Sequence, residues 1–289
     1  MKFFSAFLRL IRWPNLVFIA LTQALFYYCV YLPVFQKENL PVLSWIIIAS
    51  VLIAAAGYII NDYFDLNIDQ INKPQKNVFA RIIHRRWAII WHFTLSIVGI
   101  VATILAVGMN KWYLVLANVF CVILLWFYST SFKRQYLVGN IVISLLTAWT
   151  VLIIFFVFTD PRSAIVGNDE ETVKFFRVAF LYGGFAFISS LIREAIKDME
   201  DMEGDSRYGC RTLPIVSGLR ASRIYVAIWT VVLVAALIIL QLYVIRFGWW
   251  MAVAYSLLLI IAPLVFLLLK LSRATTTKDF TLLSNISKL

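Results

Sequence analysis

Charged residues are scarce in this sequence: Asp, Glu, Lys and Arg make up 14% of its 289 residues, against about 25% in ordinary soluble proteins. Hydrophobic residues make up 62%, and the mean hydropathy is +0.87. This balance excludes a soluble globular domain and indicates an integral membrane protein. Cysteine is scarce too, and Cys29, Cys121 and Cys210 are odd in number and scattered. They form neither a disulfide framework nor a metal-ligand spacing.

Long apolar runs are plentiful, and their lengths predict how the chain crosses a membrane. A spanning helix needs about 20 apolar residues, whereas the strands of a membrane barrel would alternate apolar and polar residues over about ten. No such alternation occurs. We therefore predict an all-α polytopic bundle that forms a single integral membrane domain over residues 1–289. The eight predicted spans cover about 14–35, 41–61, 87–108, 112–130, 137–158, 173–193, 222–246 and 248–270.

The distribution of basic residues predicts the orientation of these spans. With the N-terminus inside, 20 of the 26 Lys and Arg residues fall on the inner side, as the positive-inside rule expects. The net charge of +11 is explained by this bias and by attraction to anionic headgroups, so it does not indicate a nucleic-acid partner. The N-terminus and the loops after the second and sixth spans are predicted to be cytoplasmic.

Two stretches on that side, "NDYFDLNID" (61–69) and "KDMEDMEGD" (197–205), repeat the spacing D-x-x-D-x-x-x-D. Their aspartates are Asp62, Asp65 and Asp69 in the first copy and Asp198, Asp201 and Asp205 in the second. Positions i, i+3 and i+7 lie on one face of a helix. If each span continues as a helix for a turn or two past its apolar part, each copy therefore presents a stripe of three carboxylates. Four spans separate the copies, which favours two distant repeats with a site between them.

Acidic residues at a helix end can also simply mark the membrane boundary and face solvent. Like charges at these spacings cost a helix about 0.3 kcal/mol per pair, and the spacing occurs twice on one side, so a functional site is the better interpretation. Six carboxylates with no His or Cys nearby are hard ligands, which favour Mg²⁺ over Ca²⁺ or Mn²⁺. Mg²⁺ commonly binds one or two carboxylates together with substrate phosphates.

A metal and diphosphate site with six carboxylates also needs cations close by. The same loops supply basic residues, although each could instead be an ordinary headgroup-binding residue. On the loops of the two motifs they are Lys73, Lys76, Arg81, Arg207 and Arg211, and the intervening cytoplasmic loop adds Lys133 and Arg134. A substrate with a diphosphate at the cytoplasmic mouth and an apolar tail in the bilayer would fit, and an isoprenyl diphosphate is such a molecule.

These motifs resemble those of the UbiA superfamily of intramembrane prenyltransferases, and the resemblance spans nearly the whole chain. The first family motif, N-D-x-x-D-x-x-x-D, is matched at 61–69, and "INKP" (71–74) resembles the loop after it. The second, D-x-x-x-D followed by G-x-K/R-[ST], is matched by Asp201, Asp205, Gly209, Arg211 and Thr212. "RWPN" (12–15) resembles the R-x-x-N element of the first helix.

The resemblance implies a bundle around a central cavity, Mg²⁺ as cofactor, and ionisation of an isoprenyl diphosphate followed by attack of a lipid or aromatic acceptor. It implies catalytic roles for Asp65, Asp69, Asp201 and Asp205. The implied metal ligands are Asn61, Asp62, Asp65, Asp69, Asp198, Asp201 and Asp205. The implied substrate-binding residues are Arg12, Asn15, Asn61, Lys73, Lys133, Arg134 and Arg211.

The stretches at 193–215 and 128–148 are most similar to the branch that contains geranylgeranylglycerol-phosphate geranylgeranyltransferases. A glycerophosphate lipid is therefore the expected acceptor. Precursors of ubiquinone (4-hydroxybenzoate), menaquinone and haem remain open, because the metal motifs do not encode the acceptor pocket. The inner (plasma) membrane of a prokaryote is the expected location.

The family usually has nine helices, whereas "KDFTLLSNISKL" (278–289) contains no apolar run. Either a ninth helix has been removed or this member lacks one, and its loss would open the cavity wall to lipid. Two rival classes are less consistent with the sequence. A cation transporter would place its acids near the bilayer midplane, and a CDP-alcohol phosphotransferase would carry a D-G-x-x-A-R element, which this sequence lacks.

Overall fold

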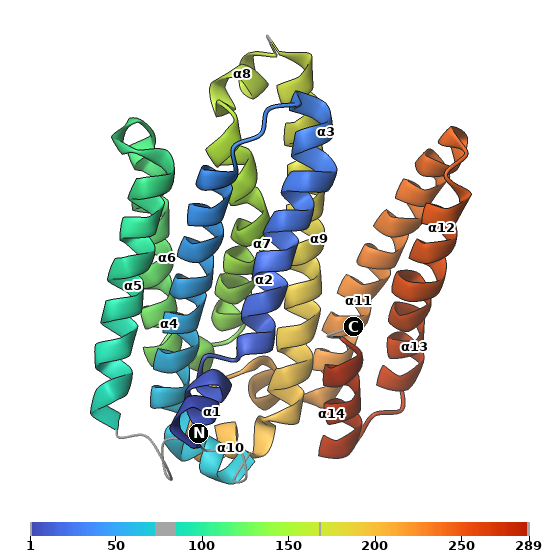
Figure 1. The fold of residues 1–289 in the computed structure, drawn as a ribbon. Helices are drawn as coiled ribbons and strands as arrows, with labels where there is room; N and C mark the ends of the chain where they lie inside the picture. Colours follow the sequence, from blue (N-terminus) through green and yellow to red (C-terminus); the bar gives the residue numbers. More distant parts are fainter. Residues whose placement is uncertain (1, 73–84, 168, 288–289) are drawn as a thin grey trace. The chain divides into compact units, whose positions relative to one another are not determined.

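The computed structural model describes residues 2–72, 85–167 and 169–287, and every regular element in these ranges is a helix (Figure 1). Eight helical segments in these ranges are long and apolar enough to cross a bilayer, and each overlaps one predicted run. They are Trp13–Phe35, Leu40–Ile68, Arg85–Val107, Met109–Thr130, Val138–Phe158, Glu170–Glu200, Leu213–Phe247 and Trp250–Leu271. The predicted all-α architecture with eight spans is confirmed.

The helices are named in chain order, with short 3₁₀ and π segments between some of them. The α-helices are α1 (Lys2–Leu10), α2 (Trp13–Phe26), α3 (Leu32–Phe35), α4 (Leu40–Asn72), α5 (Arg85–Val107), α6 (Trp112–Thr130), α7 (Val138–Phe158), α8 (Pro161–Val166), α9 (Glu170–Glu200), α10 (Met202–Arg207), α11 (Leu213–Val244), α12 (Trp250–Ser256), α13 (Ala262–Leu271) and α14 (Thr277–Ile286). The 3₁₀ segments are η2 (Met109–Lys111), η3 (Phe132–Arg134) and η4 (Ile245–Phe247). The π segments are η1 (Tyr27–Tyr31) and η5 (Leu257–Ile261).

The chain forms two compact units, which are described separately. The first comprises residues 1–132 and 145–184, and the second comprises 133–144 and 185–289. A single domain over the whole chain and a central cavity stay predictions.

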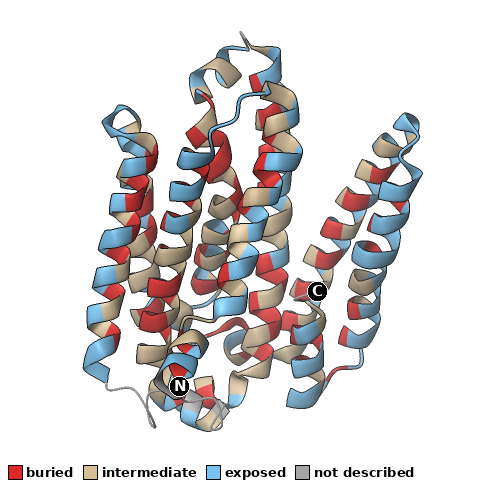
Figure 2. Ribbon diagram, in the orientation of Figure 1, coloured by how far each residue is buried: buried red, intermediate tan, exposed pale blue. Residues whose placement is uncertain are grey.

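In the first unit, α4 is the central helix and packs against α2, α5 and α6. Half of its most apolar window is buried, whereas α5 exposes a long outer face (Figure 2). Polar side chains link the helices inside this apolar setting, where few other hydrogen-bond partners exist. The Nε2 of the fully buried Gln23 donates to Ser50 Oγ at 2.8 Å and to Thr150 O at 3.0 Å, which joins α2, α4 and α7.

In the second unit, α11, α13 and α14 share one apolar core with the last turns of α9. Ile196, Val226, Leu267 and Phe280 are its representative members, each at most 2% exposed. Helix α11 begins ahead of the predicted run, with Thr212 as N-cap and a break in its first turns at Gly218, where φ is 79°. Only glycine adopts that conformation at little cost.

Lys111 caps the C-terminal end of α7, at the end of the first unit that lies opposite α1. Its ammonium donates to three main-chain oxygens, Phe156 O at 3.0 Å, Val157 O at 2.7 Å and Thr159 O at 2.8 Å. The last carbonyls of a helix have no partner within the helix and carry partial negative charge. One lysine therefore caps the C-terminal end of α7, and all three of its N–H groups are used.

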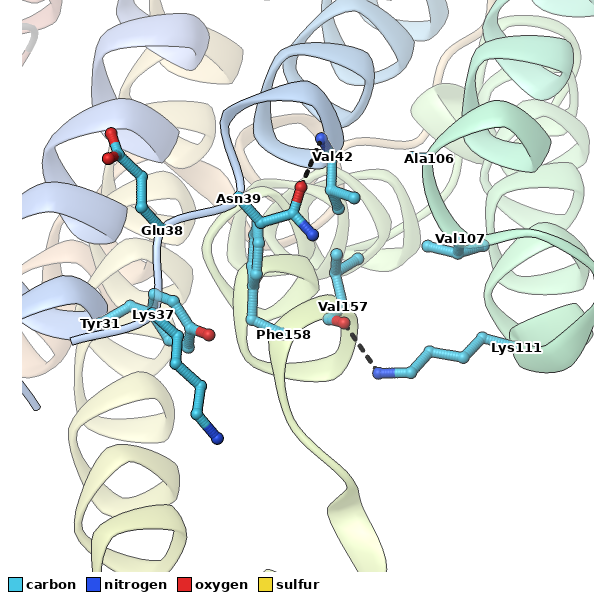
Figure 3. Close-up of a pocket in the computed structure, with 10 residues that line it drawn as sticks. All are labelled: Tyr31, Lys37, Glu38, Asn39, Val42, Ala106, Val107, Lys111, Val157 and Phe158. Atoms are coloured by element: carbon cyan, nitrogen blue, oxygen red, sulfur yellow. Dashed lines mark hydrogen bonds between the residues drawn. The ribbon is translucent and has the colours of Figure 1, made fainter. Parts of the chain in front are cut away.

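A cavity of about 310 Å³ lies beside this cap (Figure 3). Tyr31, Lys37, Asn39 and Phe158 help to line it, and the Asn39 side chain accepts a hydrogen bond from Val42 N at 3.3 Å. The cavity lies where α4 begins and α7 ends, far along α4 from its acidic motif. It is therefore separate from the predicted metal site.

Lys111→Met is expected to destabilise the protein by about 2 kcal/mol, because three helix-end carbonyls lose their donor. Thermal unfolding in detergent, followed by tryptophan fluorescence, measures the effect. The matched control is Lys174→Met, which removes an exposed pair with Glu170 at 2.7 Å and should leave the melting temperature close to that of the wild type. Equal melting temperatures for the two variants would contradict the capping role.

Candidate metal and diphosphate site

The first acidic motif lies on the final turns of α4, which continues as one helix to Asn72 beyond the predicted apolar run. Asn61, Asp62 and Asp65 therefore follow one another over little more than a turn, as predicted. Asn61 is 8% exposed, and its Nδ2 donates to Asp65 Oδ2 at 2.9 Å. Asp69 also belongs to α4, but its side chain lies outside the described residues, as do Lys73, Lys76 and Arg81.

Asp62 forms an ion pair with Arg12, which lies between α1 and α2. Arg12 Nη2 lies 2.6 Å from Asp62 Oδ1, and the two side chains are 36% and 22% exposed. The guanidinium also lies over the Tyr58 ring, 5.1 Å from its centroid. The Asp62 carboxylate raises the pKa of Arg12 above its ordinary value, since it stabilises the charged form.

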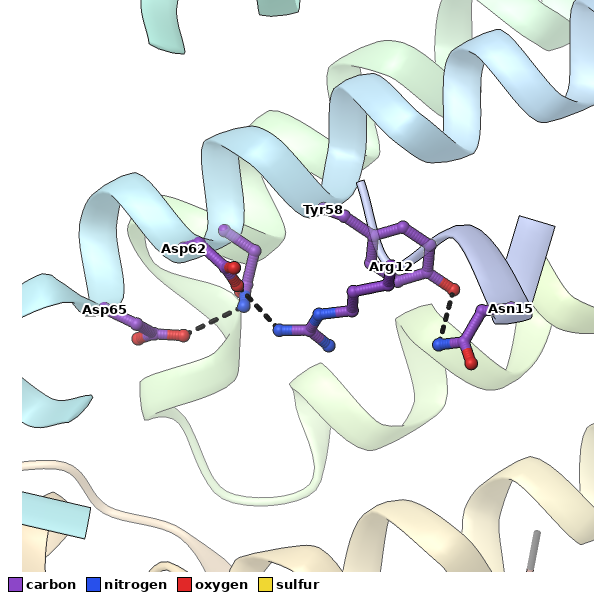
Figure 4. A network of polar contacts seen from close by, with 6 residues as sticks. Arg12, Asn15, Tyr58, Asp62 and Asp65 are labelled. Atoms are coloured by element: carbon purple, nitrogen blue, oxygen red, sulfur yellow. Dashed lines mark hydrogen bonds and ion pairs between the residues drawn. The ribbon is translucent and has the colours of Figure 1, made fainter. Parts of the chain in front are cut away.

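Arg12 adopts the left-handed conformation, with φ 51° and ψ 52°, as N-cap of α2. This conformation is unfavourable for a non-glycine residue, and the ion pair and the aromatic contact offset its cost. Asn15 Nδ2 donates to the Tyr58 hydroxyl at 3.4 Å (Figure 4). The "RWPN" element and the first acidic motif, 50 residues apart at Arg12 and Asp62, therefore meet in space.

Helix α1 supports this arrangement by packing against α4. Ala6 and Leu10 of α1 share a buried cluster with Ile59 of α4 and Ala88 of α5, and Tyr63 packs against it. These contacts hold Arg12, two residues after the end of α1, close to the acidic end of α4. The sequence pattern missed Tyr58, although it lies one helical turn before Asp62, where an aromatic ring faces the same side.

The second acidic motif differs from the expected single helical face. Helix α9 ends at Glu200, Asp201 takes φ −93° and ψ 4°, and Asp205 lies on the separate helix α10. Asp198 is thus on α9, Asp201 at the junction and Asp205 beyond it. Both copies contain three aspartates, and the second copy alone contains a glycine, Gly204, which is a weaker helix former than aspartate. The prediction of one continuous stripe was wrong for this copy.

Asn140, which belongs to none of the sequence motifs, contacts the second motif. Its Nδ2 donates to Asp198 Oδ2 at 3.0 Å, and it is 6% exposed. A lone asparagine at the start of an apolar run was the available signal. Ahead of Asp198, Glu194 is paired with Arg193 at 2.8 Å. Both contacts lie within the second unit.

The predicted diphosphate-binding cations of this unit lie on two connected segments. The main-chain N–H of Arg211 donates to the carbonyl of Arg134 at 2.7 Å, so the segment with Lys133 and Arg134 runs beside the one that follows α10. Cys210 N donates to Asp205 O at 3.0 Å, which turns the chain back after α10. Arg207 is instead paired with Glu203 at 2.7 Å on the surface.

The donors available fit a hard divalent cation, although among the described side chains no three His, Cys, Asp or Glu converge on one point. Asp65 is oriented by Asn61, and both offer oxygen atoms. Mg²⁺ needs only one or two carboxylates when substrate phosphates complete its shell. Asp62 is already paired with Arg12. A metal ion would therefore compete with the guanidinium for this carboxylate, which is a predicted metal ligand.

The described residues form eight membrane-length helices, and acidic oxygen-donor motifs lie at the ends of α4 and α9. These features define the chain as a polytopic helical membrane protein. Within this class, the chain belongs to the UbiA prenyltransferase family, whose model matches residues 13–289. The resemblance drawn from the motifs is confirmed. The chain is therefore an enzyme of the prenyltransferase class.

Two curated relatives are both digeranylgeranylglyceryl phosphate synthases. The one from Natronomonas pharaonis is 34% identical over 207 residues, covering 72% of this chain and 68% of the relative. The one from Methanothermobacter thermautotrophicus is 33% identical over 228 residues, covering 77% and 72%.

Solved structures share the fold at lower identity. One, of digeranylgeranylglyceryl phosphate synthase in membranes, has a TM-score of 0.65 and 24% identity, and covers 100% of this chain and 94% of the other. A UbiA homologue from Archaeoglobus fulgidus, bound to GPP and Mg²⁺, has a TM-score of 0.61 and 15% identity, with 98% and 95% covered.

Proposed function

We propose that this enzyme transfers a geranylgeranyl group from its diphosphate to the hydroxyl of a glycerophosphate lipid. The observation that carries the proposal is the identity of 33–34% with digeranylgeranylglyceryl phosphate synthases over more than two thirds of both chains. In this reaction the C–O bond between the prenyl group and the diphosphate breaks. The diphosphate leaves with the electron pair of that bond, a new C–O bond forms to the acceptor oxygen, and the hydroxyl proton is released to water.

We propose that Asn61, Asp65 and Asp69 on α4, and Asp201 and Asp205 after α9, bind Mg²⁺ and diphosphate. Mg²⁺, when bound there, would stabilise the negative charge that develops on the leaving diphosphate. The chain's own residues prepare the site: Asn61 fixes the orientation of Asp65, and Arg12 holds Asp62 in place. Preorganised groups of this kind stabilise developing charge without reorganising during the reaction.

Supporting roles fall to residues around these aspartates. Asp198, held by Asn140, supports the second motif, and Lys73, Lys133, Arg134 and Arg211 are candidates for diphosphate binding. Arg12 and Asn15 act through Asp62 and Tyr58 in this structure. They are therefore proposed as positioning residues of the donor site.

The orientation proposed places the N-terminus and both acidic motifs on the cytoplasmic side of a prokaryotic plasma membrane. The excess of Lys and Arg on that side supports it, with 20 of 26 residues. Both substrates are amphiphilic, so their headgroups would reach the site from the cytoplasm while their tails stay in the bilayer.

A matrix of donors and acceptors, with product mass as the readout, tests the function. Geranyl, farnesyl and geranylgeranyl diphosphates are combined with geranylgeranylglyceryl phosphate, 4-hydroxybenzoate, dihydroxynaphthoate and haem. We expect product from the geranylgeranyl donor with the glycerophosphate acceptor, loss of turnover in EDTA, and recovery on adding Mg²⁺. Product formed solely on an aromatic or haem acceptor would refute the assigned acceptor and leave the prenyltransferase class intact.

A further inference from the structure

The C-terminal helix α14 is short and amphipathic, and its start is firmly fixed. Asp279 Oδ2 accepts hydrogen bonds from Thr275 N at 3.1 Å, Thr276 N at 2.9 Å and Thr276 Oγ1 at 2.8 Å. Thr276 Oγ1 accepts from Asp279 N at 3.3 Å in return, which completes a capping box. A helix of ten residues is marginal in water, so this cap and its packing define where α14 lies.

The apolar face of α14 packs into the core that carries the end of α9. Phe280 and Leu283 are 2% and 1% exposed. They belong to the same buried cluster as Ile196 and Met199, which are the inward-facing residues of the last turn of α9. Helix α14 therefore contacts the part of α9 that leads into the second acidic motif.

A polar contact adds to this packing at the last residue of α9. The Thr281 hydroxyl lies 3.0 Å from Glu200 Oε1 and 3.0 Å from Thr277 O. A hydroxyl has one hydrogen to donate, and the charged carboxylate is the stronger acceptor of the two. This contact joins positions 81 residues apart, and the next residue after Glu200 is Asp201.

The position of Asp201 depends on where α9 ends. Its N–H still bonds to Lys197 O at 2.9 Å, as in a helix, but its ψ of 4° turns the chain into α10. A shift of Glu200 would move both Asp201 and the start of α10, where Asp205 lies. A side chain that holds Glu200 thus acts on both aspartates.

We infer that α14 is a brace for the second acidic motif, in which Thr281 is a positioning residue that holds Glu200 and so preorganises Asp201 and Asp205. The inference rests on the proposed function for the role of these aspartates. The brace itself rests on the packing of Phe280 and Leu283 and on the Thr281 to Glu200 contact, all within the second unit.

The test compares Thr281→Val with Thr281→Ser and with Thr277→Val in the full-length protein. Thr277 is a matched control, because it lies on the same helix one turn earlier and offers its carbonyl rather than its hydroxyl to Thr281. Two quantities are measured: the Mg²⁺ concentration that gives half-maximal diphosphate release, and amide hydrogen exchange of residues 198–210 without metal.

We expect Thr281→Val to raise the half-saturating Mg²⁺ concentration about fivefold, the effect of one ordinary hydrogen bond, and to speed exchange at 198–210. Thr281→Ser keeps the hydroxyl and should behave like the wild type, as should Thr277→Val. Equal values for Thr281→Val and Thr277→Val in both measurements would overturn the brace.

A double-mutant cycle with Glu200→Ala covers the case in which Thr281→Val changes the fold more broadly. If the two side chains act through each other, Thr281→Val should have little further effect once Glu200 is alanine. An undiminished effect in that background overturns the inference. Failure of the proposed function would look different, because diphosphate release would be absent from the wild type while the exchange difference at 198–210 persisted.

Discussion

Substituting asparagine for Asp65 or for Asp201 is expected to lower the rate of prenyl transfer by about a hundredfold or more, since charge stabilisation by such groups is a large part of catalysis. Asparagine keeps the size of the side chain but replaces an anionic ligand by a neutral amide. In Asp65→Asn it also removes the carboxylate that accepts from Asn61 Nδ2 at 2.9 Å. Diphosphate release and product mass, measured at saturating donor and acceptor, give the rate.

Asp160→Asn is the control for this pair of variants. Asp160 caps α8, where its side chain accepts from Arg162 N at 3.1 Å, and asparagine is an equally good N-cap. We expect wild-type turnover from this variant and wild-type melting temperatures from all three. If Asp65→Asn and Asp201→Asn both turned over at the wild-type rate, neither aspartate would belong to the reacting site.

Arg12→Met is expected to lower turnover about tenfold and to destabilise the protein by about 2 kcal/mol, less than a fully buried pair would lose because both side chains are partly exposed. The substitution leaves Asp62 without the guanidinium 2.6 Å away. An unpaired carboxylate next to Asn61 and Asp65 then repels the diphosphate. Steady-state kinetics and thermal melting measure the two effects separately.

Two further substitutions separate the charge of Arg12 from its backbone conformation. Arg12→Gly relieves the strain of the positive φ of 51° but removes the ion pair. It should therefore lower turnover as much as Arg12→Met does. Arg12→Lys keeps the charge without the planar fork and should recover part of the activity. Arg9→Met, at an exposed position of α1, is the control and should leave turnover unchanged. Full activity of Arg12→Gly would show that the residue matters solely for the turn between α1 and α2.

The two acidic motifs show where prediction from the sequence succeeded and where it stopped. For α4 the spacing correctly placed Asn61, Asp62 and Asp65 on one helix, because α4 continues unbroken to Asn72. For α9 the same spacing failed at Asp201, where the helix ends. Periodicity describes an ideal helix and contains no information about where a given helix stops.

The partners of the motifs could not be predicted, because each comes from a distant part of the chain. Arg12, Asn140 and Thr281 contact residues 50, 58 and 81 positions away. The resemblance pointed to Arg12 as a substrate-binding residue, and the structure adds its ion pair with Asp62. Helix α14 was missed because ten amphipathic residues form no apolar run, although their capping box was visible as Thr276 and Asp279.

The sequence by itself determined the class of the protein and predicted the kind of site that it carries. A bilayer requires about 20 apolar residues for each crossing, so eight such runs predict eight helices, and a doubled spacing of aspartates indicates a hard-cation site. The tertiary structure alone decided which side chains hold those aspartates in place. Ion pairs and hydrogen bonds across 50 or more residues depend on how helices pack, and packing is determined by the whole fold rather than by any local pattern.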